Sequence, residues 1–417
     1  MGSTNGTADG ESALVSAVRA GDTALAKRLL HENCDLAGLN AAFGLAVRMH
    51  AGTLAQLLLQ YGADPGQCGP DELLSLREAV DSGSPALVEA LLDHRFRDRY
   101  SASELSEVRS LAFHRHEVGL EAELRRRTGS QDALICAPVE DDEFTSVNEF
   151  TLGGITVKDG HGAILTHLEE LLDVRPEFEV LMARALDHGQ GHATWARSTI
   201  RLACRAEQAI WSAAAALRTH SSPSRRLFGA EVMRLTHLFD TGDENAFAGP
   251  ALDIFTKWSA EETDLTVLIE VLTALGEHAD PRAYAALLPY TGHSDPRIRG
   301  TVARGLSSGS EPSAYSAEVR DALMVLMTDI DTAVRRDACL TVGDGRDRDP
   351  VLADALAARL DDVDRQVQVA AVYGLAMHED ERCVEAARCL GPPQPGTHSE
   401  ERCLEAAWRY EWRRDGL

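Results

Sequence analysis

Three stretches of twelve residues decide the fold: DPRIRGTVARGL at 295–306, DTAVRRDACLTV at 331–342 and DRQVQVAAVYGL at 364–375. Each begins with aspartate, has an aliphatic fourth residue, and has small or aliphatic residues at its eighth and twelfth positions. Residues four apart share one face of a helix. Each stretch therefore predicts a helix with one buried face. We call the aliphatic fourth residue of each stretch its anchor; the three anchors, Ile298, Val334 and Val367, are spaced by 36 and 33 residues.

A second helix is predicted before each of these stretches. Twelve and eleven residues before each anchor stands an alanine–leucine pair: Ala286-Leu287, Ala322-Leu323 and Ala355-Leu356. Each unit is thus a helix, a short turn with aspartate, and a second helix. Fainter copies of the pattern occur at 195–217, 224–235 and 265–276.

This array resembles the HEAT repeat family, in particular the short bacterial form that also occurs in phycobilin lyases. In that family the aspartate and a following basic residue join neighbouring turns into a ladder. The resemblance implies this role for Arg299 and Arg335, whereas Gln368 replaces the third basic residue. The array covers residues 161–390, and a helix within 391–417 is expected to cap its end.

A different repeat lies within residues 13–128. Alanine–valine pairs at 17–18, 46–47 and 79–80 are followed by leucine pairs at 29–30, 58–59 and 91–92, with a glycine between them at 21, 52 or 83. The small pair lets two antiparallel helices approach, the glycine makes the turn, and the leucines fill the gap to the next repeat. The pattern resembles the ankyrin repeat, and Gly62-Ala63-Asp64 matches that family's GAD turn. No copy has the family's TPLH tetrapeptide, so the resemblance implies a short, degenerate array.

Residues 129–160 differ from both arrays and are expected to separate two domains. An acidic run, Glu140 to Glu143, precedes an alternating stretch at 144–157 that contains Gly153-Gly154. This pattern predicts an ordered β-hairpin or an extended linker. Residues 1–12 are small and polar, and are expected to be a disordered tail. The predicted fold class is therefore all-α, an α-solenoid of stacked helix pairs with one short hairpin.

The composition excludes several classes of function. The formal net charge is −25, whereas a protein that binds a duplex must neutralise phosphates with Lys and Arg. This argues against nucleic acid as the main ligand.

No run of about 18 apolar residues indicates a membrane span. The eight cysteines form no CxxC pair, which is typical of reduced thiols in a cytoplasm. The high Ala, Arg and Asp usage is compatible with a bacterium of high GC content.

The best candidate for a ligand site lies between His188 and Trp211. Three arginines spaced by four residues predict one basic stripe along a helix, and two tryptophans could flank it. Such a stripe could bind carboxylates, phosphates or an acidic peptide. Alternatively, the arginines pair with local acids and the tryptophans fill gaps between repeats. The candidate binding residues are His192, Trp195, Arg197, Arg201, Arg205, Glu207 and Trp211.

No metal or cofactor is expected. His114 and His116 stand two apart, so on a helix their side chains point about 200° apart and cannot share an ion. The sequence also has no GxSxG, Walker loop or strand-associated GxGxxG.

Two repeat arrays without a coherent catalytic set favour a non-catalytic scaffold or adaptor. The expected partner is a protein or peptide, and the acidic exterior favours a basic one. The alternative is an enzyme, or a small-molecule- or peptide-binding protein, with a pocket in the HEAT groove around Trp195–Trp211. Bilin lyases and alkylpurine DNA glycosylases show that HEAT-like folds can host chemistry. Convergence of those arginines and tryptophans in a closed pocket would favour the alternative.

Overall fold

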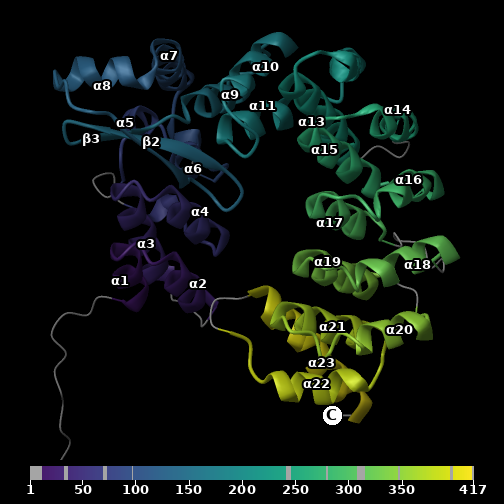
Figure 1. Cartoon of the computed structure of the whole chain (residues 1–417). Helices are drawn as coiled ribbons and strands as arrows, with labels where there is room; N and C mark the ends of the chain where they lie inside the picture. The colour runs from purple at the N-terminus through teal and green to yellow at the C-terminus, as the bar shows by residue number, and fades with distance from the viewer. Residues whose placement is uncertain are drawn as a thin grey trace, which may run out of the picture. The chain divides into compact units, whose positions relative to one another are not determined.

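The computed structural model describes residues 12–31, 36–68, 73–95, 97–240, 246–278, 280–307, 315–345, 348–394 and 398–415. Within these residues the chain is mostly helical, with 23 α-helices and three short strands (Figure 1). It divides into two compact units, residues 1–205 and 206–417. The segment expected to separate two domains, 129–160, lies inside the first unit. The expected tail, apart from Ser12, lies outside the described residues. None of the described helices is long and apolar enough to cross a bilayer.

The first unit begins with three pairs of helices. They are α1 (Ala13–Arg19) and α2 (Thr23–His31), α3 (Leu36–Arg48) and α4 (Gly52–Gln60), and α5 (Leu76–Ser82) and α6 (Pro85–Leu91). The predicted alanine–valine pairs lie near the ends of α1, α3 and α5, and all six side chains are buried. The small side chains therefore stand where the paired helices pack.

The turns inside these pairs use glycine in two cases out of three. Gly21 and Gly83 have positive φ angles of 69° and 76°, which glycine adopts without steric cost. In the middle pair the left-handed residue is His50, with φ of 56°, and Gly52 is already the first residue of α4. The expectation that Gly52 makes the turn was therefore wrong. Its lack of a side chain serves packing, since a Cβ there would lie 2.8 Å from the Ser84 hydroxyl oxygen.

A three-stranded antiparallel sheet follows helices α7 (Ala102–Val118) and α8 (Leu120–Thr128). Its strands are β1 (Ile135–Glu140), β2 (Ser146–Leu152) and β3 (Ile155–Lys158), in that order across the sheet. β2 and β3 form the expected hairpin, with Gly153 and Gly154 in its turn. Sequence analysis missed β1. Five of its six residues are exposed and one is half-buried, so it carries no apolar alternation from which a strand could be read.

Three helices complete the first unit: α9 (His161–Leu171), α10 (Phe178–Leu186) and α11 (Ala193–Ala203). α9 packs against α6, α7 and α11, and buries Ile164, Leu165 and Leu168 in the same core as the first six helices. The core therefore continues from the N-terminal pairs into α9.

The described residues of the second unit form six successive helix pairs. They are α12 (Gln208–Ala216) and α13 (Pro223–Phe239), α14 (Ala248–Glu261) and α15 (Leu265–Gly276), α16 (Pro281–Leu287) and α17 (Pro296–Gly305), α18 (Ala317–Leu326) and α19 (Thr332–Asp344), α20 (Pro350–Ala357) and α21 (Arg365–Met377), and α22 (Arg382–Leu390) and α23 (His398–Asp415). The second helices of the pairs pack against one another in chain order (Figure 1). The predicted anchors Ile298, Val334 and Val367 are buried on α17, α19 and α21.

Arginine–carboxylate pairs connect helix pairs of the second unit to the turn within the next pair. Arg299 donates to both carboxylate oxygens of Asp329, at 2.6 and 2.7 Å. Arg335 does the same to Asp362, at 2.8 and 2.9 Å. The arginines are those that the HEAT resemblance implied, but the acids are not. The aspartates expected in the ladder instead accept hydrogen bonds from the first backbone N–H groups of their own helices: Asp295, Asp331 and Asp364.

An equivalent pair, Arg226 with Glu262, connects α13 to the end of α14. Arg226 donates to both oxygens of the Glu262 carboxylate, at 2.8 and 2.9 Å. Burial alone would raise the pKa of Glu262, but these bonds, with others from Trp258 and nearby backbone N–H groups, lower it from 4.5 to about 2. A carboxyl whose pKa is lower in the folded state stabilises the fold above its unfolded pKa, and this contribution is lost as the pH falls.

We therefore expect the free energy of unfolding of the second unit to fall between pH 4.5 and pH 2, with Glu262 contributing a slope of up to about 1.4 kcal/mol per pH unit. Replacing it by Glu262→Gln should flatten this part of the curve and lower stability at pH 7. Urea unfolding followed by tryptophan fluorescence measures this. Glu261→Gln, at the exposed neighbouring residue, is the control and should retain the wild-type slope. Equal slopes in all three proteins would contradict the assignment.

Candidate functional site

The residues that the sequence nominated as a ligand site are divided between the two units. Those from His192 to Arg205 belong to the first unit, and Glu207 and Trp211 belong to the second. Trp195 is 2% exposed and Trp211 is 7% exposed. Trp211 packs its ring near that of Phe247. Neither ring is therefore available as an aromatic platform, and their burial agrees with the alternative that the tryptophans fill gaps in the packing.

The three arginines of the predicted stripe each bind a neighbouring segment of the first unit. Arg197 pairs with Glu89 of α6. Arg201 pairs with Glu170 of α9 at 3.0 Å, and Arg205 donates to the carbonyl oxygen of Pro176 at 2.8 Å. Arg197 and Arg201 thus connect α11 to neighbouring helices, whereas Arg205 lies beyond the end of α11. Glu207 stands at the N-cap of α12, in the second unit.

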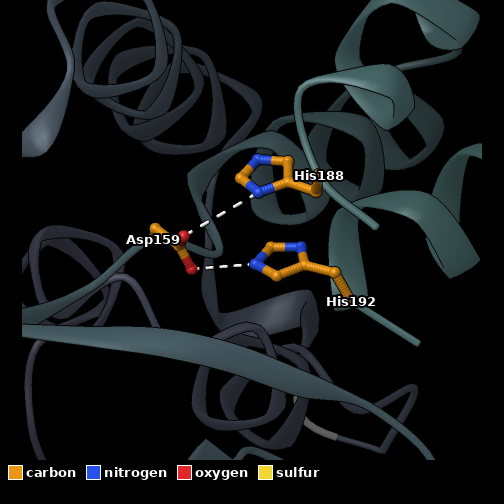
Figure 2. Close-up of side chains that lie close together, drawn as sticks. All are labelled: Asp159, His188 and His192. Atoms are coloured by element: carbon orange, nitrogen blue, oxygen red, sulfur yellow. Dashed lines mark hydrogen bonds and ion pairs between the residues drawn. The ribbon is translucent and has the colours of Figure 1, made fainter. Parts of the chain in front are cut away.

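A different cluster includes one of the nominated residues. Asp159, His188 and His192 come together in the first unit, and their ligand-type atoms all lie within 4.8 Å of one another (Figure 2). Asp159 stands between β3 and α9, His188 follows the end of α10, and His192 is the N-cap of α11. The imidazole rings are stacked, with centroids 3.8 Å apart and planes within 5°.

Both histidines direct a nitrogen at the same carboxylate. Nε2 of His192 lies 2.8 Å from Oδ1 of Asp159, and Nδ1 of His188 lies 3.8 Å from Oδ2 (Figure 2). Asn148 of β2 fixes the carboxylate by donating its backbone N–H to Oδ1 at 2.7 Å and its side-chain amide to Oδ2 at 2.8 Å. The backbone N–H of Thr194 donates to Nδ1 of His192 at 3.1 Å. Two of the three side chains are therefore oriented by neighbours.

The environment keeps Asp159 ionised and His188 neutral at pH 7. Burial alone would raise the pKa of Asp159, but hydrogen bonds from His192 and Asn148 hold it below its usual range. Burial, with a contribution from neighbouring His192, lowers the pKa of His188 to about 4. The cluster therefore offers one negative carboxylate and a neutral imidazole with a free lone pair.

A cleft of about 690 Å³ opens beside this cluster and is lined by two of its members, Asp159 and His188. His161 also lines it. This side chain is 2% exposed, and its Nε2 has no hydrogen-bond partner within the described residues. Other lining residues are Arg115, His116, Glu121, Arg125, Phe150 and Asp187.

A second candidate surface lies in the second unit, on the turns that the arginine ladder connects. Ile330 in the α18–α19 turn is 94% exposed, and Val363 in the α20–α21 turn is 99% exposed. Arg335 donates to the carbonyl oxygens of Asp329 and Ile330, at 2.9 and 3.2 Å. Gln368 donates to that of Asp362 at 2.8 Å. The two exposed aliphatic side chains therefore project from turns whose backbones are held in place.

Comparison with known proteins identifies no family. No family model and no curated protein matches this sequence. Among solved structures, the Escherichia coli protein YibA is 15% identical, with a TM-score of 0.42, over 57% of this chain and 93% of its own. An engineered protein is also 15% identical, with a TM-score of 0.42, over 95% of this chain and 97% of its own.

Sequence analysis found two of the three clustered residues and missed the third. His188 and His192 lie in the nominated stretch, spaced by four residues. Asp159 lies far from them in the sequence, at the end of a strand, and nothing in its local pattern links it to the histidines. The signal that could have found it is the hairpin, because β2 and β3 place Asn148 beside Asp159.

Proposed function

We propose that this chain is a partner-binding scaffold built from helical repeats, ankyrin-like in the first unit and HEAT-like in the second. The observation that carries the proposal is the pair of exposed side chains on consecutive ladder turns, Ile330 and Val363. Single exposed aliphatic residues are common on protein surfaces. A pair at the same position of consecutive repeats, on turns fixed by buried arginine contacts, is a preorganised surface.

The residues around the pair favour a particular kind of partner. The turn sequences are DID at 329–331 and DVD at 362–364, so each aliphatic residue stands between two aspartates. Ladder and cap contacts occupy several of these carboxylates, but Asp361 beside the second turn is exposed. The chain as a whole carries 66 acidic residues against 41 basic ones. The matching partner is a protein segment with aliphatic pockets flanked by Lys or Arg, and complementary charge accelerates its association.

The double variant Ile330→Ser and Val363→Ser tests this function. Both side chains are almost fully exposed, so folding should be unchanged, whereas removal of two interface anchors should weaken partner binding at least about tenfold. The partner recovered by affinity capture with the wild-type chain is purified and titrated against each protein at low and high salt. Val351→Ser, at a 48% exposed residue of α20 outside the turns, is the control.

The proposal is supported if the double variant binds more weakly than the wild type while the Val351→Ser control binds equally well. Binding by the wild type should also weaken when salt is added. Undiminished binding by the double variant contradicts the proposal. A wild-type chain that captures no protein, but turns over a small molecule, would favour the enzyme alternative.

A further inference from the structure

We propose that Asp159, His188 and His192 form a binding site for Zn²⁺ or a similar late first-row divalent ion. This inference is independent of the proposed scaffold function. Imidazole nitrogen with carboxylate oxygen is a ligand set that suits such ions. Two observations carry the proposal: the mutual geometry of the three side chains, and the buried Nε2 of His161, which has no hydrogen-bond partner within the described residues, in the cleft that Asp159 and His188 line.

The distances fit coordination of one ion. Ligand atoms bound to Zn²⁺ at 2.0–2.2 Å in a tetrahedral site lie about 3.3 Å from one another. The two measured nitrogen–oxygen separations, 2.8 and 3.8 Å, lie on either side of this value. All three ligand-type atoms lie within 4.8 Å of one another. Because the two imidazole planes are nearly parallel and a ligating lone pair lies in the ring plane, at least one ring must rotate for all three side chains to bind one ion.

One of the three ligands, Asp159, has the hydrogen-bonded neighbours that metal sites require, whereas the contact between Thr194 and His192 would have to change. Ligating carboxylates are normally hydrogen-bonded by further residues, and both oxygens of Asp159 accept bonds from Asn148. In the unliganded ring of His192, Nδ1 accepts the Thr194 N–H, so the proton lies on Nε2 and points toward Asp159. An ion bound at Nε2 of His192 would replace this proton. The proton would then move to Nδ1 of the same ring, and the hydrogen bond from the Thr194 N–H to Nδ1 would be lost.

Three protein ligands leave one position of a tetrahedral ion for water or another ligand. Asp159 and His188 line the cleft, so the open position would face it. His161 lines the same cleft with a buried Nε2 that lacks a partner, and a buried polar atom normally has one. A ligand or water held on the ion could supply this missing hydrogen bond.

Zinc binding to the full chain tests the site. The protein is stripped with a chelator and titrated with Zn²⁺ against a chromophoric competitor. Co²⁺ then serves as a spectroscopic probe, because its visible bands report coordination geometry. We expect one ion per chain at the site and a rise in the melting temperature of the first unit.

Three variants remove one ligand each, His188→Ala, Asp159→Asn and His192→Asn, and each should lower the affinity at least about 100-fold. Asn at position 192 can still cap α11, so this variant separates loss of a ligand from loss of folding, and the circular dichroism of all variants checks it. His114→Ala, at an exposed histidine of α7, is the control and should bind as the wild type does. No binding by the wild type overturns the proposal. So does equal affinity in all variants, which would place the ion at cysteines or elsewhere.

Discussion

Replacing Arg335 by alanine is expected to destabilise the second unit by roughly 3–5 kcal/mol. The guanidinium donates to both oxygens of Asp362 and to two carbonyl oxygens of its own turn. The Arg335 side chain is 10% exposed and that of Asp362 is 4% exposed. The same contact holds the pKa of Asp362 below its usual range. The variant would leave this carboxylate ionised, buried and without its main partner.

The size of the effect follows from burial, since an unpaired buried charge costs far more than an exposed one. Arg336→Ala is the matched control, because Arg336 is the next residue of α19 but its side chain is 41% exposed. Its loss should cost less than about 1 kcal/mol. Urea unfolding of the full chain, followed by tryptophan fluorescence, reports mainly on the second unit, which contains four of the five tryptophans. Equal losses from the two substitutions would show that the ladder does not hold the turns together.

The ladder also shows how far repeat patterns alone predict structure. The spacing of Ile298, Val334 and Val367 placed the helices and their buried faces correctly, because helix periodicity directly reflects burial. It could not identify the acid that binds each arginine. Asp329 and Asp331 stand in one turn, and both are suited to cap a helix or to pair with a cation. Only the three-dimensional arrangement shows that Asp331 caps α19 while Asp329 binds Arg299.

The candidate sites were less predictable than the helices. The spacing of Arg197, Arg201 and Arg205 predicted a basic stripe, but α11 ends before Arg205, and the spacing could not identify the partners of the arginines. Glu89 and Glu170 lie on other helices, so they were invisible to local pattern. Asp159, the third member of the cluster with His188 and His192, was missed for the same reason. Periodicity reports which face of a helix is buried, whereas a site depends on contacts between segments distant in the sequence.

Replacing Asp141 by alanine should destabilise the first unit by roughly 3–5 kcal/mol. Nothing in the sequence indicated that this residue is buried. It belongs to the acidic run that was assigned to a hairpin or linker, yet its side chain is 0% exposed. Its carboxylate accepts bonds from the Ser84 hydroxyl at 2.7 Å, the Ala86 backbone N–H at 2.8 Å and the Lys158 ammonium at 3.0 Å. It thus attaches the sheet to the start of α6.

Loss of these contacts would leave an N–H group at the start of α6 and the half-buried Lys158 ammonium without their acceptor. Asp141→Asn keeps an acceptor but removes the charge, so its loss of stability should be intermediate. Glu143→Ala is the control from the same acidic run. Glu143 is 53% exposed and pairs only weakly with Lys27 at 3.4 Å, and its removal should cost less than about 1 kcal/mol. Hydrogen exchange of the backbone amides of residues 12–205, followed by mass spectrometry of the full chain, measures the loss of stability in the first unit.

The position of Lys158 gives the Asp141 variant a second expected effect. Lys158 is the last residue of β3 and directly precedes Asp159. Freeing its side chain should loosen the backbone that holds the Asp159 carboxylate against the two histidines. We therefore expect Asp141→Ala to weaken Zn²⁺ binding about tenfold at a temperature where the first unit is still folded. An affinity equal to that of the wild type would show that Asn148 alone is enough to hold Asp159 in place.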